Sequence, residues 1–140
     1  MDLNRYNFSK TLLAMLFLTL LLNSCFLKQD RTTTVYGTIT DEKGQSVDSI
    51  LVIFQGMKDL NLEILSSEFS DQKGEYDIVM EVPKKFTSIN VTIPFFPAEN
   101  SKYMRLFKTK RSTKNGQSTG NCCIAQIGEK TRYDFELIAK

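Results

Sequence analysis

The sequence contains no histidine and no tryptophan, and these two absences remove large classes of function. Without histidine, neither a Ser-His-Asp nor a Cys-His nucleophile can be assembled, and the commonest protein ligand of zinc and non-haem iron is missing. Without tryptophan, the aromatic platform that sugar-binding proteins often use is missing too. The formal net charge of +2 gives no reason to expect nucleic acid as a partner. We therefore expect no metal site, no catalytic residues and no enzyme.

A long apolar run is also missing. Arg5 and Lys10 precede an apolar stretch from Leu12 to Leu22, which only Thr19 interrupts. This stretch has the length of the hydrophobic region of a secretory signal, and it is shorter than the roughly 20 residues that a membrane-spanning helix needs. It also lacks the amphipathic spacing of a helix packed against a core. We interpret residues 1–24 as a signal peptide that is cleaved during export.

The residues that end this run distinguish two kinds of export signal. An ordinary signal peptidase requires small residues at the first and third positions before the cut, and Leu22 is not small. Leu22-Asn23-Ser24-Cys25 instead resembles the bacterial lipobox, in which an aliphatic residue, a tolerant position and a small residue precede Cys. The resemblance implies that Cys25 becomes the first residue of the mature protein and carries a diacylglyceryl group and an N-acyl group. The alternative is an unmodified Cys25, free or in a disulfide.

A covalent lipid would determine where the protein resides. Each buried methylene contributes roughly 0.8 kcal/mol, and one acyl chain anchors only marginally, so three chains would hold the protein on a membrane almost permanently. In many Gram-negative bacteria an Asp directly after the lipidated Cys favours retention in the inner membrane, whereas this chain has Phe26 there. We therefore expect a lipoprotein of the outer membrane, periplasmic or surface-facing, with residues 25–33 as its lipidated N-terminus and polar tether. No other cofactor is expected.

From residue 34 onward, apolar residues recur with a spacing close to two, and strand-forming residues dominate. Turn residues separate the runs at DEKG, DQKG, FFPAEN and TKNGQSTGN. No helix-period window of useful length follows the signal peptide. Short strands at this spacing predict that residues 34–140 form one all-β sandwich. The predicted strands are 34–40, 49–55, 62–70, 76–82, 86–95, 102–109 and 132–139.

Two segments resemble the carboxypeptidase regulatory-like domain. The first runs from Val35 to Gly44 (VYGTITDEKG) and continues with Val47 and the apolar strand Ile50–Phe54. The second, Ser70–Ile78 (SDQKGEYDI), is similar to the second turn-and-strand signature of that family. The resemblance covers roughly residues 34–82 and implies a transthyretin-like, Greek-key sandwich of about seven strands. Hydrolases and dioxygenases with related folds rely on His, so the resemblance does not imply an enzyme here.

Cys122 and Cys123 are adjacent in the sequence. Neighbouring Cα atoms lie about 3.8 Å apart across a trans peptide, below the usual disulfide range of about 4.4–6.8 Å. A disulfide between them would be strained and easily reduced. A vicinal disulfide is therefore one possibility. The alternative is that one cysteine packs inward in a short strand over residues 122–127, while the other faces outward or pairs with small thiols.

Residues 102–114 include several basic residues and no acidic one. Such a segment could attract an anionic partner, for example a polysaccharide or a lipid headgroup. The alternative is a solvated edge strand, on which lysines discourage aggregation between sheets. The candidate anion-binding residues are Lys102, Arg105, Lys108, Lys110, Arg111 and Lys114.

Strand 49–55 is apolar on both faces. Alternation points Ile50, Val52 and Phe54 at the core and leaves Leu51 and Ile53 on the opposite face. This outer face is either a docking site or lies under the long loop TKRSTKNGQSTGN, which we favour. The aromatic residues available as sugar platforms or exposed apolar surface are Phe95, Phe96 and Tyr103.

The sequence therefore predicts a non-enzymatic, lipid-anchored protein of the cell envelope. Its β-sandwich is expected to serve as a protein-interaction or structural accessory module. The alternative is a glycan-binding lipoprotein that serves nutrient uptake. The expected partners are the membrane, through the anchor, and either an envelope protein or a glycan, with no nucleic acid.

Overall fold

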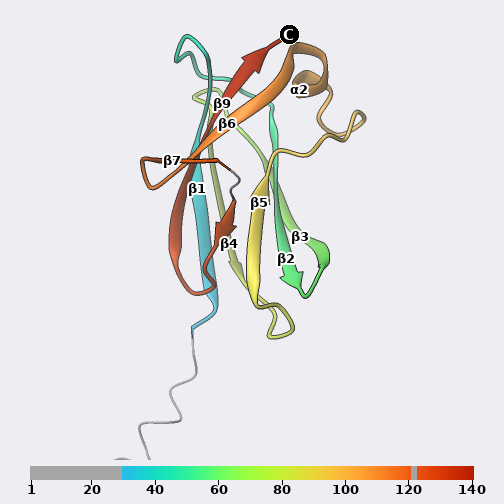
Figure 1. The fold of residues 1–140 in the computed structure, drawn as a ribbon, viewed down its shortest axis with the longest axis vertical. Helices are drawn as coiled ribbons and strands as arrows, with labels where there is room; N and C mark the ends of the chain where they lie inside the picture. The colour runs from blue at the N-terminus through green and yellow to red at the C-terminus, as the bar shows by residue number, and fades with distance from the viewer. Residues whose placement is uncertain (1–29, 121–122) are drawn as a thin grey trace, which may run out of the picture. The chain divides into compact units, whose positions relative to one another are not determined.

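The computed structural model describes residues 30–120 and 123–140. The predicted signal peptide, Cys25 and Cys122 lie outside these residues. Arg31–Lys140 form one compact unit built of two β-sheets (Figure 1), which confirms the predicted all-β sandwich. Its first strand starts at Thr32, and Thr33 is fully buried. The expected domain boundary at residue 34 is therefore too late, and residues 31–33 belong to the sandwich instead of the tether.

One sheet has five strands in the order β4-β1-β9-β6-β7. Strand β1 is antiparallel to β4 and parallel to β9, and the remaining pairs are antiparallel. The strands are β1 (Thr32–Asp41), β4 (Glu75–Glu81), β6 (Phe107–Lys114), β7 (Gln117–Thr119) and β9 (Lys130–Ala139).

The other sheet has four strands in the order β3-β2-β5-β8. They are β2 (Leu51–Lys58), β3 (Asn61–Phe69), β5 (Ser88–Thr92) and β8 (Ile124–Ala125). The chain crosses to this sheet after β1, forms the β2–β3 hairpin, and returns to pair β4 with β1. The first and fourth strands are therefore neighbours, as in a Greek key.

The core lies between the two sheets because side chains alternate along each strand. In β1 the odd-numbered residues from Thr33 to Ile39 are buried and the even-numbered ones are not, and β9 shows the same alternation from Lys130 to Leu137. The largest fully buried side chains from both sheets and their connections include Val35, Ile39, Val52, Phe54, Ile89, Tyr133, Phe135 and Leu137.

The two predicted Asp-x-x-Gly turns form as their residues require. The Oδ1 atom of Asp41 accepts hydrogen bonds from the backbone N–H groups of Lys43 and Gln45, and Asp71 repeats this pattern in the second turn. Gly44 and Gly74 have φ angles of 75° and 74°, which cost glycine little.

The predicted strand at 102–109 is wrong in its first half. Ser101–Leu106 form a short helix, α2, and β6 starts only at Phe107. Tyr103 and Phe107 lie four residues apart, and their ring centroids are 6.3 Å apart, as helical spacing allows. The predicted loop at 109–121 is largely strand, because β6 continues to Lys114 and pairs with β7.

Candidate functional site

The outer face of the five-stranded sheet contains an open depression of about 420 Å³ near its edge strand β4. Tyr36 and Thr38 face this side because their neighbours along β1 point into the core. The depression is lined by Tyr36, Gly37, Thr38, Glu68, Asp71, Glu75, Tyr76, Asp77 and Arg132.

Three neighbouring strands contribute a row of polar side chains to this depression. Tyr36 on β1 pairs in register with Asp77 on β4 and with Arg132 on β9. The ammonium of Lys130 lies 4.6 Å from the centroid of the Tyr36 ring, a distance at which a cation is attracted to an aromatic face. The row therefore has a carboxylate at one end, an aromatic ring in the middle and cations at the other end.

The β1–β9 ladder is interrupted beneath this row, and side chains replace the missing backbone bonds. The backbone N–H and the hydroxyl of Thr38 both donate to Oδ1 of Asp134, each at 2.9 Å. The other oxygen of Asp134 accepts from Nε of Arg132 at 2.9 Å. Asp134 thereby holds Arg132 in place and closes the gap between the two strands.

Gly37 allows the strands to approach at this point. A Cβ at Gly37 would overlap the backbone carbonyl oxygen of Tyr133. That oxygen accepts a hydrogen bond of 2.7 Å from the hydroxyl of Tyr76. Burial raises the pKa of Tyr76 far above its ordinary value, so its hydroxyl keeps its proton and the floor of the depression stays hydrogen-bonded.

The opposite rim of the depression is acidic. Asp71 uses one oxygen to hold its own turn, and Glu68 on β3 accepts a hydrogen bond of 3.2 Å from the backbone N–H of Asp77. Within the described part of the chain, the carboxylates of Glu75 and Asp77 take part in no ion pair. The β3–β4 side of the depression thus offers negative charge and the β9 side positive charge.

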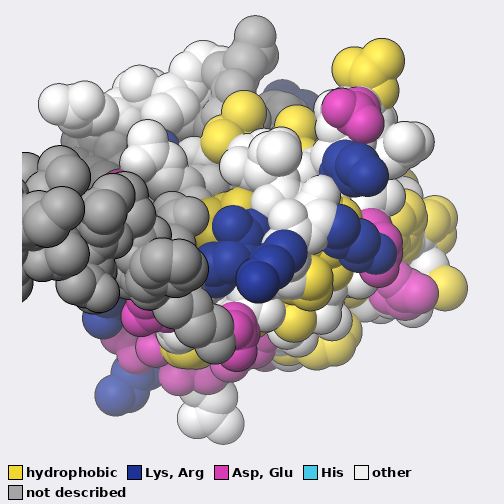
Figure 2. Space-filling view, turned by 90° about the horizontal axis from the view of Figure 1, so that it is seen from below, with side chains coloured by type: hydrophobic (Ala, Val, Ile, Leu, Met, Phe, Trp, Pro, Cys, Tyr) yellow, Lys and Arg dark blue, Asp and Glu magenta, His cyan; other side chains and the backbone are white. Residues whose placement is uncertain are grey.

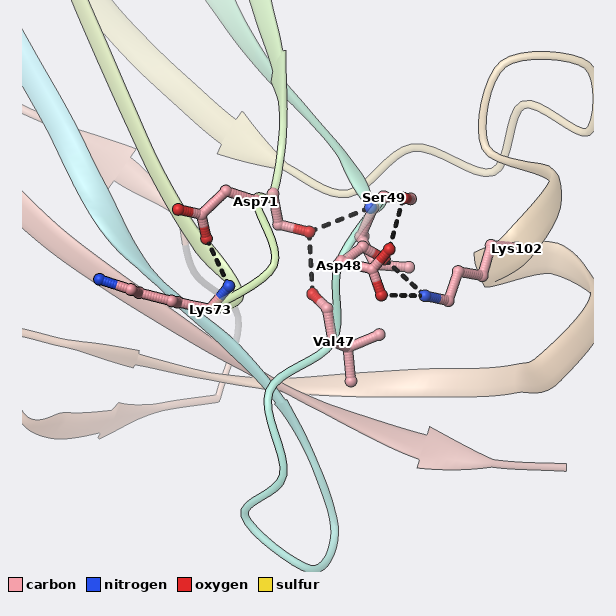
Figure 3. A network of polar contacts seen from close by, with 8 residues as sticks. Val47, Asp48, Ser49, Asp71, Lys73 and Lys102 are labelled. Atoms are coloured by element: carbon pink, nitrogen blue, oxygen red, sulfur yellow. Dashed lines mark hydrogen bonds and ion pairs between the residues drawn. The ribbon is translucent and has the colours of Figure 1, made fainter.

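The predicted basic segment at 102–114 is distributed over several parts of the fold. Lys102 on α2 binds Asp48, with 2.6 Å between Nζ and Oδ1 and 2.8 Å between Nζ and the Asp48 carbonyl (Figure 3). The hydrogen bonds from Lys102 and then Ser49 lower the pKa of Asp48 to about 2. Figure 3 shows that this contact ties α2 to the segment before β2.

Three further basic residues of this segment also bind protein atoms. Nζ of Lys110 donates to the carbonyl of Ile93 at 2.6 Å, and burial lowers the pKa of Lys110 to about 8. Arg111 pairs with Glu136 at 2.8 Å on the outer face, and Lys114 reaches the carbonyl of Ile124.

Among the described residues, the side chains of Arg105 and Lys108 form no ion pair. The six candidate residues are therefore not gathered into one anion-binding patch.

Cys123 is almost fully buried and is disulfide-bonded. The other two cysteines of the chain, Cys25 and Cys122, lie outside the described residues, so the vicinal pairing of Cys122 with Cys123 stays a prediction, as does the lipidation of Cys25. Cys123 borders a second depression of about 410 Å³, which is lined by Thr92, Lys110, Arg111, Ser112, Ser118, Thr119, Gly120 and Cys123.

The apolar outer face of β2 is covered at its start. Leu51 and Ile53 are only 5% and 2% exposed. The Asn100 side chain binds both the N–H and the carbonyl of Leu51, at 3.1 and 3.3 Å, and holds the segment 94–100 there. The predicted covering is therefore confirmed. The loop named for it is not responsible, because β6 and β7 lie in the other sheet.

Of the aromatic candidates, Tyr103 is fully buried and offers no surface to a sugar, whereas Phe95 and Phe96 are exposed. Tyr36 was not among the predicted site residues. The available signal was its position between Val35 and Gly37, since alternation places it outward. The register that brings Asp77 and Arg132 to either side of it joins residues far apart in the sequence.

The described residues contain no group of His, Cys, Asp and Glu that could hold a metal ion. Nor does any helix within them have the length and apolar character to cross a membrane. No protein-family model matches the sequence, and no curated protein shows significant similarity to it. The fold and the site therefore define an all-β sandwich with a charged, open depression on one outer face.

Proposed function

We propose that this protein is a lipid-anchored lipoprotein of the bacterial outer membrane whose β-sandwich works without catalysis as a protein-interaction module. The row Asp77–Tyr36–Arg132 is the observation that carries the proposal. It combines an aromatic residue and an arginine, both enriched at protein interfaces, with carboxylates on the opposite rim. The lipobox-like sequence before Cys25 supports the anchor.

The depression suits an extended protein segment that carries charges of both signs. Its acidic rim on β3 and β4 complements Lys or Arg, and Arg132 complements Asp or Glu. Exposed ion pairs contribute only about 0.2–1 kcal/mol each, so the charges chiefly fix orientation while Tyr36 supplies most of the contact area. This arrangement is typical of a reversible interaction.

The alternative function is glycan binding in the service of nutrient uptake. The outward-facing Tyr36, flanked by polar groups, is the feature that favours it. The ammonium of Lys130 already lies over the Tyr36 ring at 4.6 Å, and a stacked sugar would have to displace it. We therefore rank a protein partner first.

A photo-crosslinking amino acid at position 75, which lines the depression and leaves Tyr36 in place, tests the binding proposal in the full chain expressed in its native cells. We expect one predominant crosslinked envelope protein, which mass spectrometry identifies. The crosslink should weaken at least several-fold in the Asp77→Asn, Arg132→Gln double variant. Glu136→Gln on the same face, where Glu136 pairs with Arg111, serves as the matched control.

No crosslinked protein, or an adduct unaffected by the double variant, would overturn the interaction site. Glycan-array binding that Tyr36→Ala abolishes would favour the alternative function.

The anchor has its own test. In cells grown with radioactive palmitate, the parent protein should become radioactive and the Cys25→Ala variant should not. When the lipoprotein signal peptidase is inhibited, a heavier precursor of the parent protein should accumulate. A Cys25→Ala protein that still sediments with membranes to the same extent would refute the lipid anchor.

A further inference from the structure

One end of the sandwich carries a leucine that no part of the described chain covers. Leu60 lies in the turn between β2 and β3 and is 99% exposed. Two further apolar residues follow at alternate positions on β3, where Leu62 is 53% and Ile64 is 49% exposed. An exposed apolar tip continued by an apolar stripe is a feature that soluble surfaces usually avoid.

The same end of the sandwich contains the start of β1. Arg31, directly before β1, donates from Nε to the carbonyl of Val82 at 2.9 Å and from Nη2 to that of Phe86 at 2.7 Å. The β4–β5 connection that Arg31 binds lies beside the β2–β3 turn, because Thr87 N–H donates to the carbonyl of Met57. Figure 1 shows the start of β1 and these two connections together at the lower end.

Basic residues lie in or beside the two connections at this end of the sandwich. Lys58 precedes the turn, and Lys84 and Lys85 lie in the β4–β5 connection. Figure 2 views this end and shows Lys and Arg side chains gathered at its centre, with acidic side chains nearer its edge. Lysines beside an exposed leucine suit a membrane interface, where the leucine enters the apolar layer and the ammonium groups remain among the headgroups.

The acidic residues of this end balance its basic ones. Asp59 lies in the turn, Glu63 pairs with Lys85 at 2.6 Å, and Glu81 and Glu129 lie nearby. General attraction of the whole end to anionic lipid is therefore weak. The apolar tip, and not the net charge, is the group that would hold this end on a lipid surface.

We infer that the end of the sandwich carrying Leu60 lies against the membrane and that Leu60 enters its headgroup layer. This inference rests on the proposed lipid at Cys25. Residues 25–30 span at most about 20 Å when fully extended, whereas β1, with its 10 residues, is about 33 Å long. A lipid on Cys25 thus keeps the start of β1, and with it the Leu60 end, within about 20 Å of the membrane, nearer on average than the α2 end.

The absence of tryptophan from the chain makes a single-site reporter possible. The full-length Leu60→Trp protein, purified with its lipid, is reconstituted into vesicles of phosphatidylethanolamine and phosphatidylglycerol. We expect a blue-shifted emission maximum and strong quenching by brominated lipids. Phe95→Trp, an exposed position beyond the far end of β5, is the control and should show neither effect.

Intact mass of both variants separates the possible failures. The reference is the Cys25→Ala, Leu60→Trp protein in water, which carries no lipid. If the lipidated Leu60→Trp protein has the same emission maximum as this reference and is not quenched by brominated lipids, this inference alone is overturned. Absence of the lipid from Cys25 would overturn the proposed anchor and this inference with it. A blue shift in native membranes but not in pure lipid vesicles would assign Leu60 to a protein partner and would likewise overturn the inference.

Discussion

The outer faces of the two sheets differ in what they expose. The five-stranded sheet presents Tyr36, Asp77 and Arg132 in an open depression. The four-stranded sheet presents Leu51 and Ile53, which are both buried, and Asn100 holds the segment 94–100 at Leu51. In both sheets, alternation decides which residues face outward. The comparison shows that a connection, and not the strand itself, decides whether an outward face becomes core or surface.

The largest effect is expected at Gly37, on which the open face depends. Gly37→Ala places a Cβ against the carbonyl oxygen of Tyr133, so β1 must move away from β9. We expect a loss of about 3 kcal/mol or more in the free energy of unfolding, measured by urea denaturation. Gly120→Ala, where nothing lies within 4 Å of the added Cβ, should change it by less than about 0.5 kcal/mol. Equal losses would mean that close approach is not the reason for Gly37.

The covered face is tested at Asn100. Asn100→Ala leaves the buried N–H and carbonyl of Leu51 without their partner, which costs about 2 kcal/mol, and it should expose Leu51 and Ile53 to a hydrophobic dye. Asn90→Ala in the same sheet removes only a partly buried bond to Gln55 and should cost less than about 1 kcal/mol. If dye binding is the same as in the parent, another contact keeps this face covered.

Lys110 joins β6 to the segment that follows β5, and it should make stability depend on pH. Burial lowers its pKa from 10.5 to about 8 in the folded protein, so between these values the unfolded chain binds more protons. Stability should therefore rise with pH in this window, by on the order of 1–2 kcal/mol. Urea denaturation of the parent protein at pH 7.5 and pH 10 measures the rise.

Two variants remove this linkage in different ways. Lys110→Met has no charge to lose, and Lys110→Arg keeps its charge throughout the window. In both variants, the free energy of unfolding should rise less between pH 7.5 and pH 10 than it does in the parent protein. A parent-like rise in both variants would assign the pH dependence to other groups.

The smallest effect is expected at the exposed pair of Asp48 and Lys102. The pKa of Asp48 is lowered from 3.8 to about 2, so its contribution to stability is present above pH 4 and is lost as the pH falls towards 2. Asp48→Asn should flatten this part of the acid denaturation curve slightly. Lys102→Met should flatten the same part of the curve. The Asp48→Asn, Lys102→Met double variant should change the curve little more than either single variant does. Fully additive effects would show that the two side chains act independently.

Local patterns predicted much of the fold. The turns at Asp41 and Asp71 were recognisable because Asp bonds to the backbone just ahead of it and Gly accepts a positive φ. The helix α2 was missed because six residues are too few to establish a helical period, and its tertiary contacts decide its conformation. The expectation that Tyr103 lies at the surface depends on the same predicted strand, whereas Tyr103 is fully buried.

The candidate site was less predictable than the fold. The basic residues of the 102–114 segment stood out because they are close in sequence, yet Lys102 and Lys110 reach different parts of the structure. No local pattern distinguishes Tyr36, Asp77 and Arg132, because each is an ordinary outward residue of a strand. They form a candidate site only because β4, β1 and β9 lie side by side in the folded sheet.

The sequence by itself determined the strand content, the tight turns and the division of residues into inward and outward sets, because these depend on neighbours along the chain. Only the tertiary structure decided that Asp77, Tyr36 and Arg132 form one row and that Leu51 and Ile53 are covered. Both outcomes depend on pairing between distant segments. The β1–β9 register in particular joins the two ends of the described chain, and no local pattern encodes that contact.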